Sequence, residues 1–311
     1  MLQKTKYLTS LLGVITLSVL FIIGSCNLQG TGSGVMELSI SDAPVNDPAI
    51  NGVYITIEDV QYVAPGGGWQ SMNEFEAPQT YNLLELTGGN SELLGNLTLP
   101  ANEYEQIRFI LSAPDEGTQL AEGNSGSWVN YDENAEFNES VDKPLFVPSA
   151  AQTGYKAESE QPFVVPENGT VAITAEFDVR KALVDPESSG TFILKPVLRL
   201  VVNNQAGSIS GSVTAQNSNS MVVYAYEADT FDSNQPNEGD NGYPNAVTSV
   251  AAADDGSYTL AFLAEGSYDL VVAQYDPEGE YIAGSGENVD RAAVSVTAGD
   301  ESTGISITED D

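Results

Sequence analysis

The residues that could carry out catalysis are few. Ser149 and Lys156 could form a nucleophilic pair, because a lysine with a depressed pKa can deprotonate a serine. Carboxylates such as Glu158 and Glu160 could serve glycoside hydrolysis. However, nothing in the spacing fixes the first pair, and 45 acidic residues produce neighbouring carboxylates by composition alone. The chain also has no histidine, which excludes Ser-His-Asp machinery and His-bound zinc. We therefore expect no catalytic residue and no enzymatic activity.

A second group of polar residues could bind a cation. Asp229, Asp232, Asn234 and Asp240 lie close together in the sequence and carry the oxygen ligands that calcium prefers. The stretch lacks the Asp-x-Asp-x-Asp-Gly order and the bidentate glutamate of known calcium loops, so a solvated loop is the competing interpretation. A structural calcium ion is the one cofactor that this pattern suggests, and we expect no other.

Three aromatic residues are candidates for stacking on a sugar ring. They are Trp69, Trp128 and Tyr131, and the last two lie in a Gly-, Asn- and acid-rich stretch, 113–141, that reads as a long loop. Packing within the protein is the competing role, because large aromatic side chains are mostly buried. The scarce cations are expected to pair with carboxylates; they include Arg108, Arg180, Lys181, Lys195 and Arg199.

The single cysteine follows a pattern typical of export. Lys4 and Lys6 precede an apolar run over residues 8–23, which is shorter than the roughly 20 residues that span a bilayer. The sequence Ile23-Gly24-Ser25-Cys26 resembles the lipobox of bacterial lipoproteins. This resemblance implies cleavage between Ser25 and Cys26 and acylation of the Cys26 thiol. An ordinary signal peptide with a chance cysteine, or an uncleaved anchor, is the alternative.

The composition narrows the partners and the location. A formal net charge of −35 repels nucleic acid and anionic headgroups, so we expect no nucleic-acid partner. Membrane attachment would come from acyl chains on Cys26. The expected location is the bacterial cell envelope, with the protein anchored to the outer membrane on its periplasmic or surface-exposed face. Without a second cysteine the fold has no internal disulfide and depends on burial of apolar side chains.

The hydrophobic pattern predicts strands almost throughout. Residues 35–40 alternate apolar and polar side chains, and residues 53–62 continue the alternation with a bulge near Asp59. Ser91 could cap a short helix that ends at Leu97. Further strands are expected at 107–111, 163–165, 171–177 and 191–202. Helical periodicity is nowhere sustained, so the sequence predicts an all-β protein with two β-sandwich domains after the signal peptide.

Six separated motifs carry a family resemblance. They are Leu38 to Val45, Tyr81 to Leu86, Leu99 to Arg108, Val147 to Ser149 with Thr153 to Lys156, Phe177 to Val184, and Leu194 to Leu200. In this order they resemble the bacterial domain of unknown function 4382, which is common in exported lipoproteins and brings no known activity. The resemblance covers residues 35–203.

A second β domain begins near residue 207. Its motifs Ile-x-Gly-x-Val, Asp-Gly-x-Tyr and Gly-x-Tyr-x-Leu are similar to those of carboxypeptidase-regulatory-like, transthyretin-like modules, which share a carbohydrate-binding-like fold. Short strands at hairpin spacing also favour a seven-strand sandwich. We therefore divide the chain into a signal peptide (1–25), a tether (26–34), a first β domain (35–204) and a second (205–311).

Together these features predict a lipid-anchored extracytoplasmic module that binds or scaffolds without catalysis, with a glycan or a surface protein as its partner. A fimbrillin-like subunit of a surface assembly is the alternative. Such subunits are processed at a basic residue in the first domain, and this chain has no Lys or Arg between Cys26 and Arg108, which weakens that alternative. A hydrolase is a further alternative, disfavoured by the absence of histidine.

Overall fold

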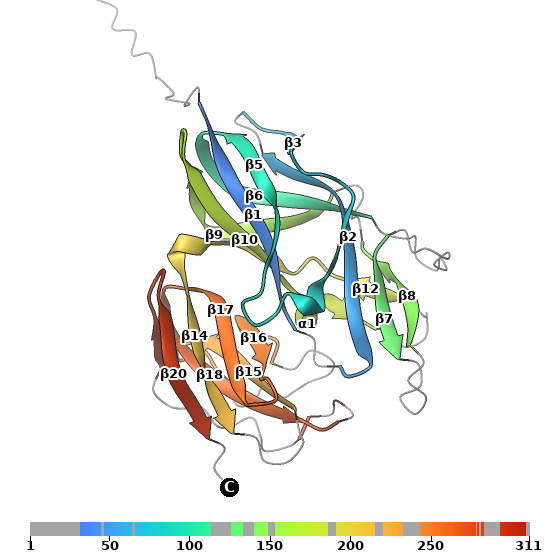
Figure 1. The fold of residues 1–311 in the computed structure, drawn as a ribbon, viewed down its shortest axis with the longest axis vertical. Helices are drawn as coiled ribbons and strands as arrows, with labels where there is room; N and C mark the ends of the chain where they lie inside the picture. Colours follow the sequence, from blue (N-terminus) through green and yellow to red (C-terminus); the bar gives the residue numbers. More distant parts are fainter. Residues whose placement is uncertain are drawn as a thin grey trace, which may run out of the picture.

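The computed structural model confirms an all-β protein (Figure 1). It describes residues 32–44, 47–63, 66–112, 126–132, 140–148, 153–185, 191–214, 220–232, 243–277, 279, 281–282 and 293–308. The predicted signal peptide, with Ser25 and Cys26, lies outside these residues, as do Ser149, Asn234 and Asp240. No helix among the described residues is long and apolar enough to span a bilayer.

Strands β1 to β13 form the first unit. Their bounds are β1 (Ser33–Ala43), β2 (Ile50–Val63), β3 (Trp69–Ser71), β4 (Gln79–Asn82), β5 (Glu92–Pro100), β6 (Asn102–Ser112), β7 (Trp128–Asp132), β8 (Ser140–Phe146), β9 (Tyr155–Val165), β10 (Thr170–Asp178), β11 (Leu183–Val184), β12 (Phe192–Leu194) and β13 (Leu198–Val202). Two 3-10 turns, η1 (Leu83–Glu85) and η2 (Asn203–Gln205), and one helical turn, α1 (Val179–Ala182), accompany them. The strands join in the order β11-β12-β8-β7-β2-β6-β9-β13-β10-β1-β5, with β3 and β4 on β2.

Alternation of side chains explains how this sheet encloses its core. In β1, Met36, Leu38 and Ile40 are fully buried while Glu37 is exposed, as the period-2 pattern predicts. β2 pairs with β7 and then β6 along its length, and its register shifts between Ile57 and Asp59. This shift is the β-bulge that the sequence predicts near Asp59. The buried side chains of the unit form one continuous hydrophobic cluster.

The helix predicted from Ser91 to Leu97 is wrong, because residues 92–97 belong to strand β5. Leu94 and Leu97 are both buried, and their spacing of three residues imitates a helix. The cause is a bulge against β1, where Gly95 pairs with Leu38 and Leu93 pairs with Ser39. Gly95 has a φ of 155°, a conformation that suits glycine.

Two further predictions about elements need correction. The stretch 113–141 is not one loop, because it contains β7 and the first residues of β8. β7 is short and half polar, so its sequence signal is weak. The strand predicted over 191–202 is two strands, β12 and β13, interrupted by Lys195-Pro196-Val197. Pro196 cannot donate to a strand ladder, which explains the break.

The second unit is a β-sandwich of seven strands within the described residues, as predicted. β17 (Ser257–Ala264), β14 (Ala206–Thr214) and β20 (Glu301–Thr308) form one sheet. β16 (Thr248–Ala251), β15 (Ser220–Glu227), β18 (Gly266–Tyr275) and β19 (Val294–Val296) form the other. One core lies between the sheets. A second, tyrosine-rich cluster covers the opposite face of β15 and β18, and its members include Tyr224, Tyr226, Tyr243 and Tyr275.

Candidate functional site at the unit junction

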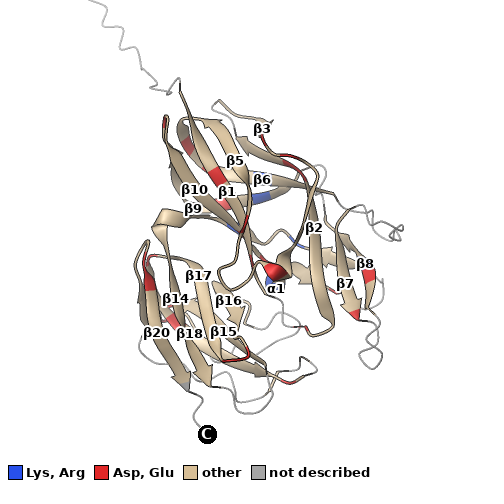
Figure 2. Ribbon diagram, viewed as in Figure 1, with Lys and Arg blue, Asp and Glu red and all other residues tan. Residues whose placement is uncertain are grey.

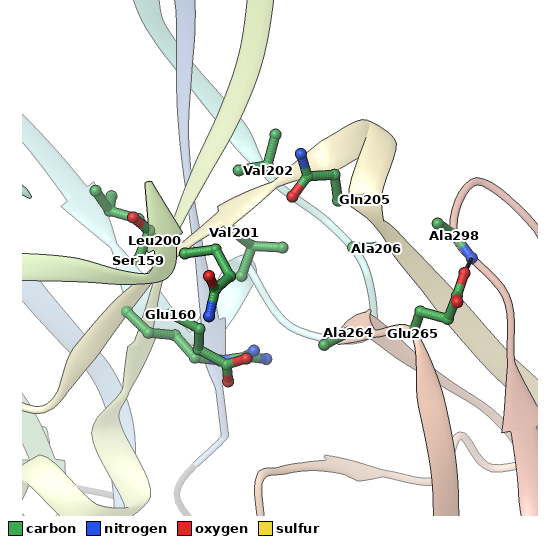
Figure 3. Close-up of a pocket in the computed structure, with 12 residues that line it drawn as sticks. Ser159, Glu160, Leu200, Val201, Val202, Gln205, Ala206, Ala264, Glu265 and Ala298 are labelled. Carbon is green, nitrogen blue, oxygen red and sulfur yellow. Dashed lines mark hydrogen bonds between the residues drawn. The ribbon is translucent and has the colours of Figure 1, made fainter. Parts of the chain in front are cut away.

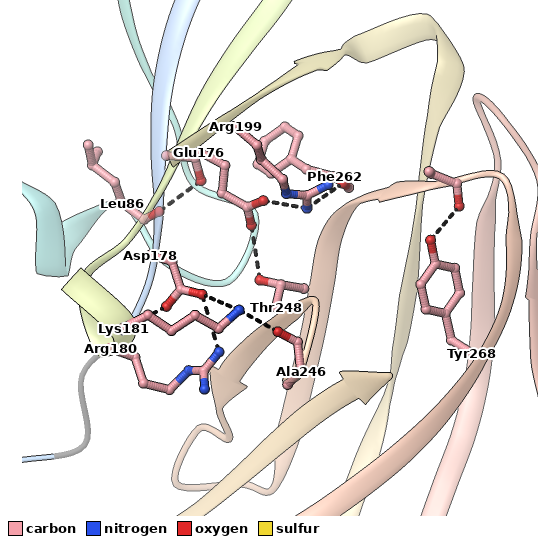
Figure 4. A network of polar contacts seen from close by, with 12 residues as sticks. Leu86, Glu176, Asp178, Arg180, Lys181, Arg199, Ala246, Thr248, Phe262 and Tyr268 are labelled. Atoms are coloured by element: carbon pink, nitrogen blue, oxygen red, sulfur yellow. Dashed lines mark hydrogen bonds and ion pairs between the residues drawn. The ribbon is translucent and has the colours of Figure 1, made fainter. Parts of the chain in front are cut away.

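The two units meet through charged residues at the end of β10 and on its neighbour β13. Asp178 caps α1, because its Oδ1 accepts the backbone N–H of Lys181 at 3.1 Å. Its Oδ2 pairs with Lys181 Nζ at 2.9 Å and with Arg180 Nη2 at 3.2 Å. The tight turn therefore places two cations and one carboxylate side by side, facing the second unit (Figure 4). We call the charged residues Asp42, Glu176, Asp178, Arg180, Lys181 and Arg199 the junction.

Arg180 and Lys181 reach across to the segment between β15 and β16. Arg180 Nη1 donates to the Tyr243 carbonyl at 2.8 Å, and the guanidinium carbon lies 5.4 Å from the centre of the Tyr224 ring. Lys181 Nζ donates to the Ala246 carbonyl at 2.5 Å. Arg180 is only 3% exposed, so its charge depends on these partners for compensation.

Glu176 and Arg199 form the second half of the junction. They are direct partners in the β10–β13 register and form an ion pair. Each also bonds to the second unit: Thr248 Oγ1 donates to Glu176 Oε1 at 3.0 Å, and Arg199 Nη2 donates to the Phe262 carbonyl at 2.9 Å. Together with the bonds from Arg180 and Lys181, these give four side-chain hydrogen bonds between the units among the described residues.

Backbone strain is concentrated at this contact. Tyr243 and Phe262 have φ values of 55° and 57°, which bulky residues rarely adopt. Their carbonyl oxygens are the ones that accept bonds from Arg180 and Arg199. Phe262 also lies in a break of the β14–β17 register, where Gly207 pairs with Leu263 and Ile209 pairs with Leu260. The second unit is therefore distorted where it receives the arginines of the first.

Asp42, at the end of β1, connects the junction to the start of α1. Its Oδ1 accepts the Val179 backbone N–H at 3.0 Å, which fixes the start of α1. Among the described residues its Oδ2 has no hydrogen-bond partner. Burial, together with Asp178 and Glu176 nearby, raises the pKa of Asp42 well above its usual value, although the Val179 bond opposes this shift.

Burial also shifts the pKa of two other junction residues. It raises the pKa of Glu176, while Arg199 and Thr248 act in the opposite direction. It lowers the pKa of Lys181, while Asp178 opposes that change. The junction thus combines an electrostatic cost of desolvation with compensating ion pairs, an arrangement suited to fixing one orientation of two surfaces.

Two cavities border the junction. The smaller, about 120 Å³, is lined by Glu176, Asp178, Lys181, Arg199 and Thr248 with neighbouring apolar residues. The larger, about 330 Å³, opens where β9 and β13 separate beyond their last registered pair, Ser159 and Leu200 (Figure 3). Glu160, Gln205 and Glu265 line it together with valine and alanine side chains.

The prediction that scarce cations pair with carboxylates is confirmed for Arg180, Lys181 and Arg199, whereas Arg108 and Lys195 form no ion pair among the described residues. What sequence reasoning missed is that these residues also bind the second unit. A signal was present, because the motifs that carry the family resemblance contain Asp42, Asp178, Arg180, Lys181 and Arg199. Their convergence at one place required the fold.

The aromatic candidates do not form one platform. Trp128 stacks on Tyr54, with ring centres 4.6 Å apart and planes 7° from parallel. Tyr131 lies three residues further along β7, so it is on the opposite face, where it packs against Phe192 and under Lys143. Trp69, on β3, pairs with Val63 at one end of β2, whereas Trp128 pairs with Tyr54 near the other end. The Arg108 guanidinium lies over the Trp69 ring. Sugar stacking by these residues stays a prediction.

Only part of the predicted calcium site can be located. Asp229 follows β15 with a φ of 65°, and its N–H donates to Asp269 Oδ2 at 2.8 Å. Asp232 is described as well, whereas Asn234 and Asp240 are not. Within the described residues no group of three acidic, cysteine or histidine side chains is placed to hold a metal ion. Calcium binding by this stretch stays a prediction.

Comparison with known proteins identifies one family. The sequence pattern described as "Domain of unknown function (DUF4382)" matches residues 33–196, slightly more than half of the chain. No curated protein matches the sequence.

Solved structures give only distant matches. The minor pilin GBS52 of Streptococcus agalactiae is 12% identical with a TM-score of 0.21, over 89% of this chain and 97% of that one. The shaft pilin SpaA of Lactobacillus rhamnosus GG is 11% identical with a TM-score of 0.20, over 90% and 98%. The Bacillus anthracis TIE protein is 13% identical with a TM-score of 0.20 over 88% of this chain, which spans 34% of that protein. Similarity at this level gives no information on function.

Proposed function

This chain belongs to the DUF4382 family, and from that premise we propose that it is a non-catalytic scaffolding and binding module of the bacterial cell envelope, anchored by acyl chains on Cys26. The observation that carries the proposal is the junction. Two domains that act independently would need no more than a flexible linker between them. This protein fixes its two units to each other with buried charge.

The placement of the chain ends fits a role in spacing. In Figure 1 the start of β1 lies at the end of the first unit that is remote from the second, and β20 runs to the opposite end of the molecule. An anchor attached ahead of β1 would therefore hold the second unit away from the membrane. The short segment between Cys26 and β1, with glycines and polar residues, would act as a flexible tether that lifts the first unit off the bilayer.

The charge distribution supports the same proposal. Acidic residues occur on strands of both units, whereas basic residues are few (Figure 2). Three of the ten basic residues are used at the junction. The absence of histidine also removes the usual acid–base group of neutral pH, which is in keeping with binding or support rather than catalysis.

Small-angle scattering on the purified protein tests whether the two units are held rigidly. Arg180→Ala combined with Arg199→Ala should widen the distribution of distances between the units, while each unit keeps its β-sheet circular dichroism. Lys195→Ala, which removes one exposed cation from the first unit, is the matched control and should leave the distribution unchanged. A double variant that scatters like the wild type would refute the spacing role.

The anchor is tested separately. Cys26→Ser should abolish labelling by radioactive palmitate and release the protein from the detergent phase into the aqueous phase. Unchanged partitioning and labelling would contradict lipid anchoring. Turnover on a panel of glycans and esters that disappears on changing Ser149 or one carboxylate would show the protein to be a hydrolase instead.

A fimbrillin-like subunit of a surface assembly is the second candidate, and the fixed end-to-end arrangement of two β units favours it. The position of the first basic residue after Cys26 weighs against processing at such a site. Arg108 lies in the middle of β6, paired with Gln61 on β2 and with Lys156 on β9, where a protease has poor access. Surface polymers, or a mature N-terminus beyond Cys26, would favour this candidate.

A further inference from the structure

Two cations outside the junction are arranged in a way that packing alone does not explain. Arg108 on β6 and Lys156 on β9 are direct partners in the antiparallel register, so two like charges face each other. Like charges in this position destabilise a sheet. The chain has 45 acidic and ten basic residues, so by composition alone a carboxylate is several times more frequent than a second cation as the partner of either residue.

Neither cation uses the carboxylates that are nearby. Glu158 lies two residues beyond Lys156 on the same face of β9, yet among the described residues neither Lys156 nor Arg108 forms an ion pair. Asp59, on the neighbouring strand, accepts bonds from Gln61 Nε2 and Ser71 Oγ, both at 2.6 Å. Within the described part of the chain, this face therefore carries two cations that have no carboxylate in ion-pair contact.

Both cations instead adjoin the indole ring of Trp69. The Arg108 guanidinium carbon lies 4.4 Å from the ring centre, and Lys156 Nζ lies 5.9 Å from it. Arg108 is held in place because its Nε donates to Gln61 Oε1 at 2.7 Å and its Nη1 donates to the Thr153 carbonyl at 3.2 Å. Lys156 is exposed, and Trp69 and Arg108 are half-buried. We call Trp69, Arg108 and Lys156 the outer-face cluster.

We propose that the outer-face cluster binds an acidic oligosaccharide, with the indole against a sugar ring and the two cations against its carboxylate or sulfate groups. An arginine and a lysine supply charge-assisted hydrogen bonds, and an indole face suits the C–H surface of a pyranose. A second copy of this chain is a poorer occupant, because two molecules of charge −35 repel each other. This inference rests on the proposed binding role and names the chemistry of its ligand.

Fluorescence can report on this site directly, because the chain has only two tryptophans. The variant Trp128→Phe leaves Trp69 as the sole indole. Titration with tetragalacturonate should change Trp69 emission, and added salt should weaken the binding. A heparin-derived tetrasaccharide distinguishes sulfate from carboxylate as the recognised group. The fully methyl-esterified tetragalacturonate, which is neutral, should bind at least about tenfold more weakly.

Variants in the same Trp128→Phe background assign the binding to the cluster. Lys156→Gln and Arg108→Gln should each weaken binding about tenfold, and Lys195→Gln, the matched loss of an exposed cation elsewhere, should leave it within about twofold. Arg108→Lys, which keeps the charge but loses the planar fork, should fall between these values. Circular dichroism melts confirm that each variant is folded.

Four results would overturn the inference. The first is no emission change with either acidic sugar at about 10 mM, a concentration far above the dissociation constants of ordinary recognition. The second is equal affinity for the neutral ester, and the third is equal weakening of binding by Lys195→Gln. Binding of an acidic protein but of neither sugar would also overturn it. None of these results would affect the scattering test of the junction. The proposed ligand can therefore be refuted without refuting the proposed scaffolding role.

Discussion

The junction and the outer-face cluster use the same scarce residue types in opposite ways. At the junction, Arg180 is 3% exposed and pairs with Asp178 while donating to a second-unit carbonyl. In the outer-face cluster, Lys156 is exposed, lies opposite another cation in the strand register and adjoins an indole ring, and it forms no ion pair among the described residues. Buried charge with paired partners fixes structure, whereas exposed charge without carboxylate partners is available to a ligand. The difference gives each cluster a distinct expected response to mutation.

The largest effect is expected at the junction. Arg180→Ala should lower the free energy of unfolding by about 3–5 kcal/mol, because it leaves a buried carboxylate, Asp178, with less compensation and removes the bond to the Tyr243 carbonyl. Urea denaturation monitored by circular dichroism measures the change. Lys195→Ala, at an exposed position of the same unit, should change it by less than about 0.5 kcal/mol. Equal losses in the two variants would show that Arg180 contributes no more to stability than an exposed cation does.

A smaller, pH-dependent effect is expected from Asp42. Its pKa is raised by burial, so the folded protein holds this proton more tightly than the unfolded chain does. The stabilisation from that proton is complete below the unfolded-state pKa of about 4 and is lost as the pH rises through the higher folded-state pKa. Asp42→Asn removes this titration.

The wild type should therefore lose more stability than Asp42→Asn between pH 4 and pH 7, by about 1.4 kcal/mol for each unit of pKa shift. Urea denaturation at several pH values measures both slopes. Glu176, whose pKa is also raised, titrates in both proteins, so the difference between the two slopes reports Asp42 together with its coupling to Glu176. Parallel pH profiles for the two proteins would show that Asp42 does not titrate differently on folding.

The smallest effect on stability is expected in the outer-face cluster. Lys156→Gln should change the free energy of unfolding by no more than about 0.5 kcal/mol and should tend to stabilise, because it removes a like-charge cross-strand neighbour of Arg108. Thermal melts at low salt, where charge effects are strongest, provide the measurement. A loss above about 2 kcal/mol would indicate that Lys156 is structural, and the contrast with the junction would fail.

Sequence reasoning succeeded where period and composition dominate. Alternation along β1 and β2 predicted strands with the correct buried face, and the bulge near Asp59 was visible as a break in that alternation. It failed at β5, because a bulge at Gly95 gave Leu94 and Leu97 a helical spacing. It also failed at β7, whose five half-polar residues are recognisable as a strand only beside β2 and β8.

By itself, the sequence determined the all-β class, the family and the scarcity of cations, because these depend on local pattern and residue counts. Only the tertiary structure decided what each cation does. Arg108 and Arg199 look equivalent along the chain, since each lies in an apolar strand motif. Their neighbours come from segments distant in sequence: an indole on β3 for one, and a carboxylate on β10 with a carbonyl of the second unit for the other. Strand order, which is set by long-range packing, therefore separates a structural charge from one available for binding.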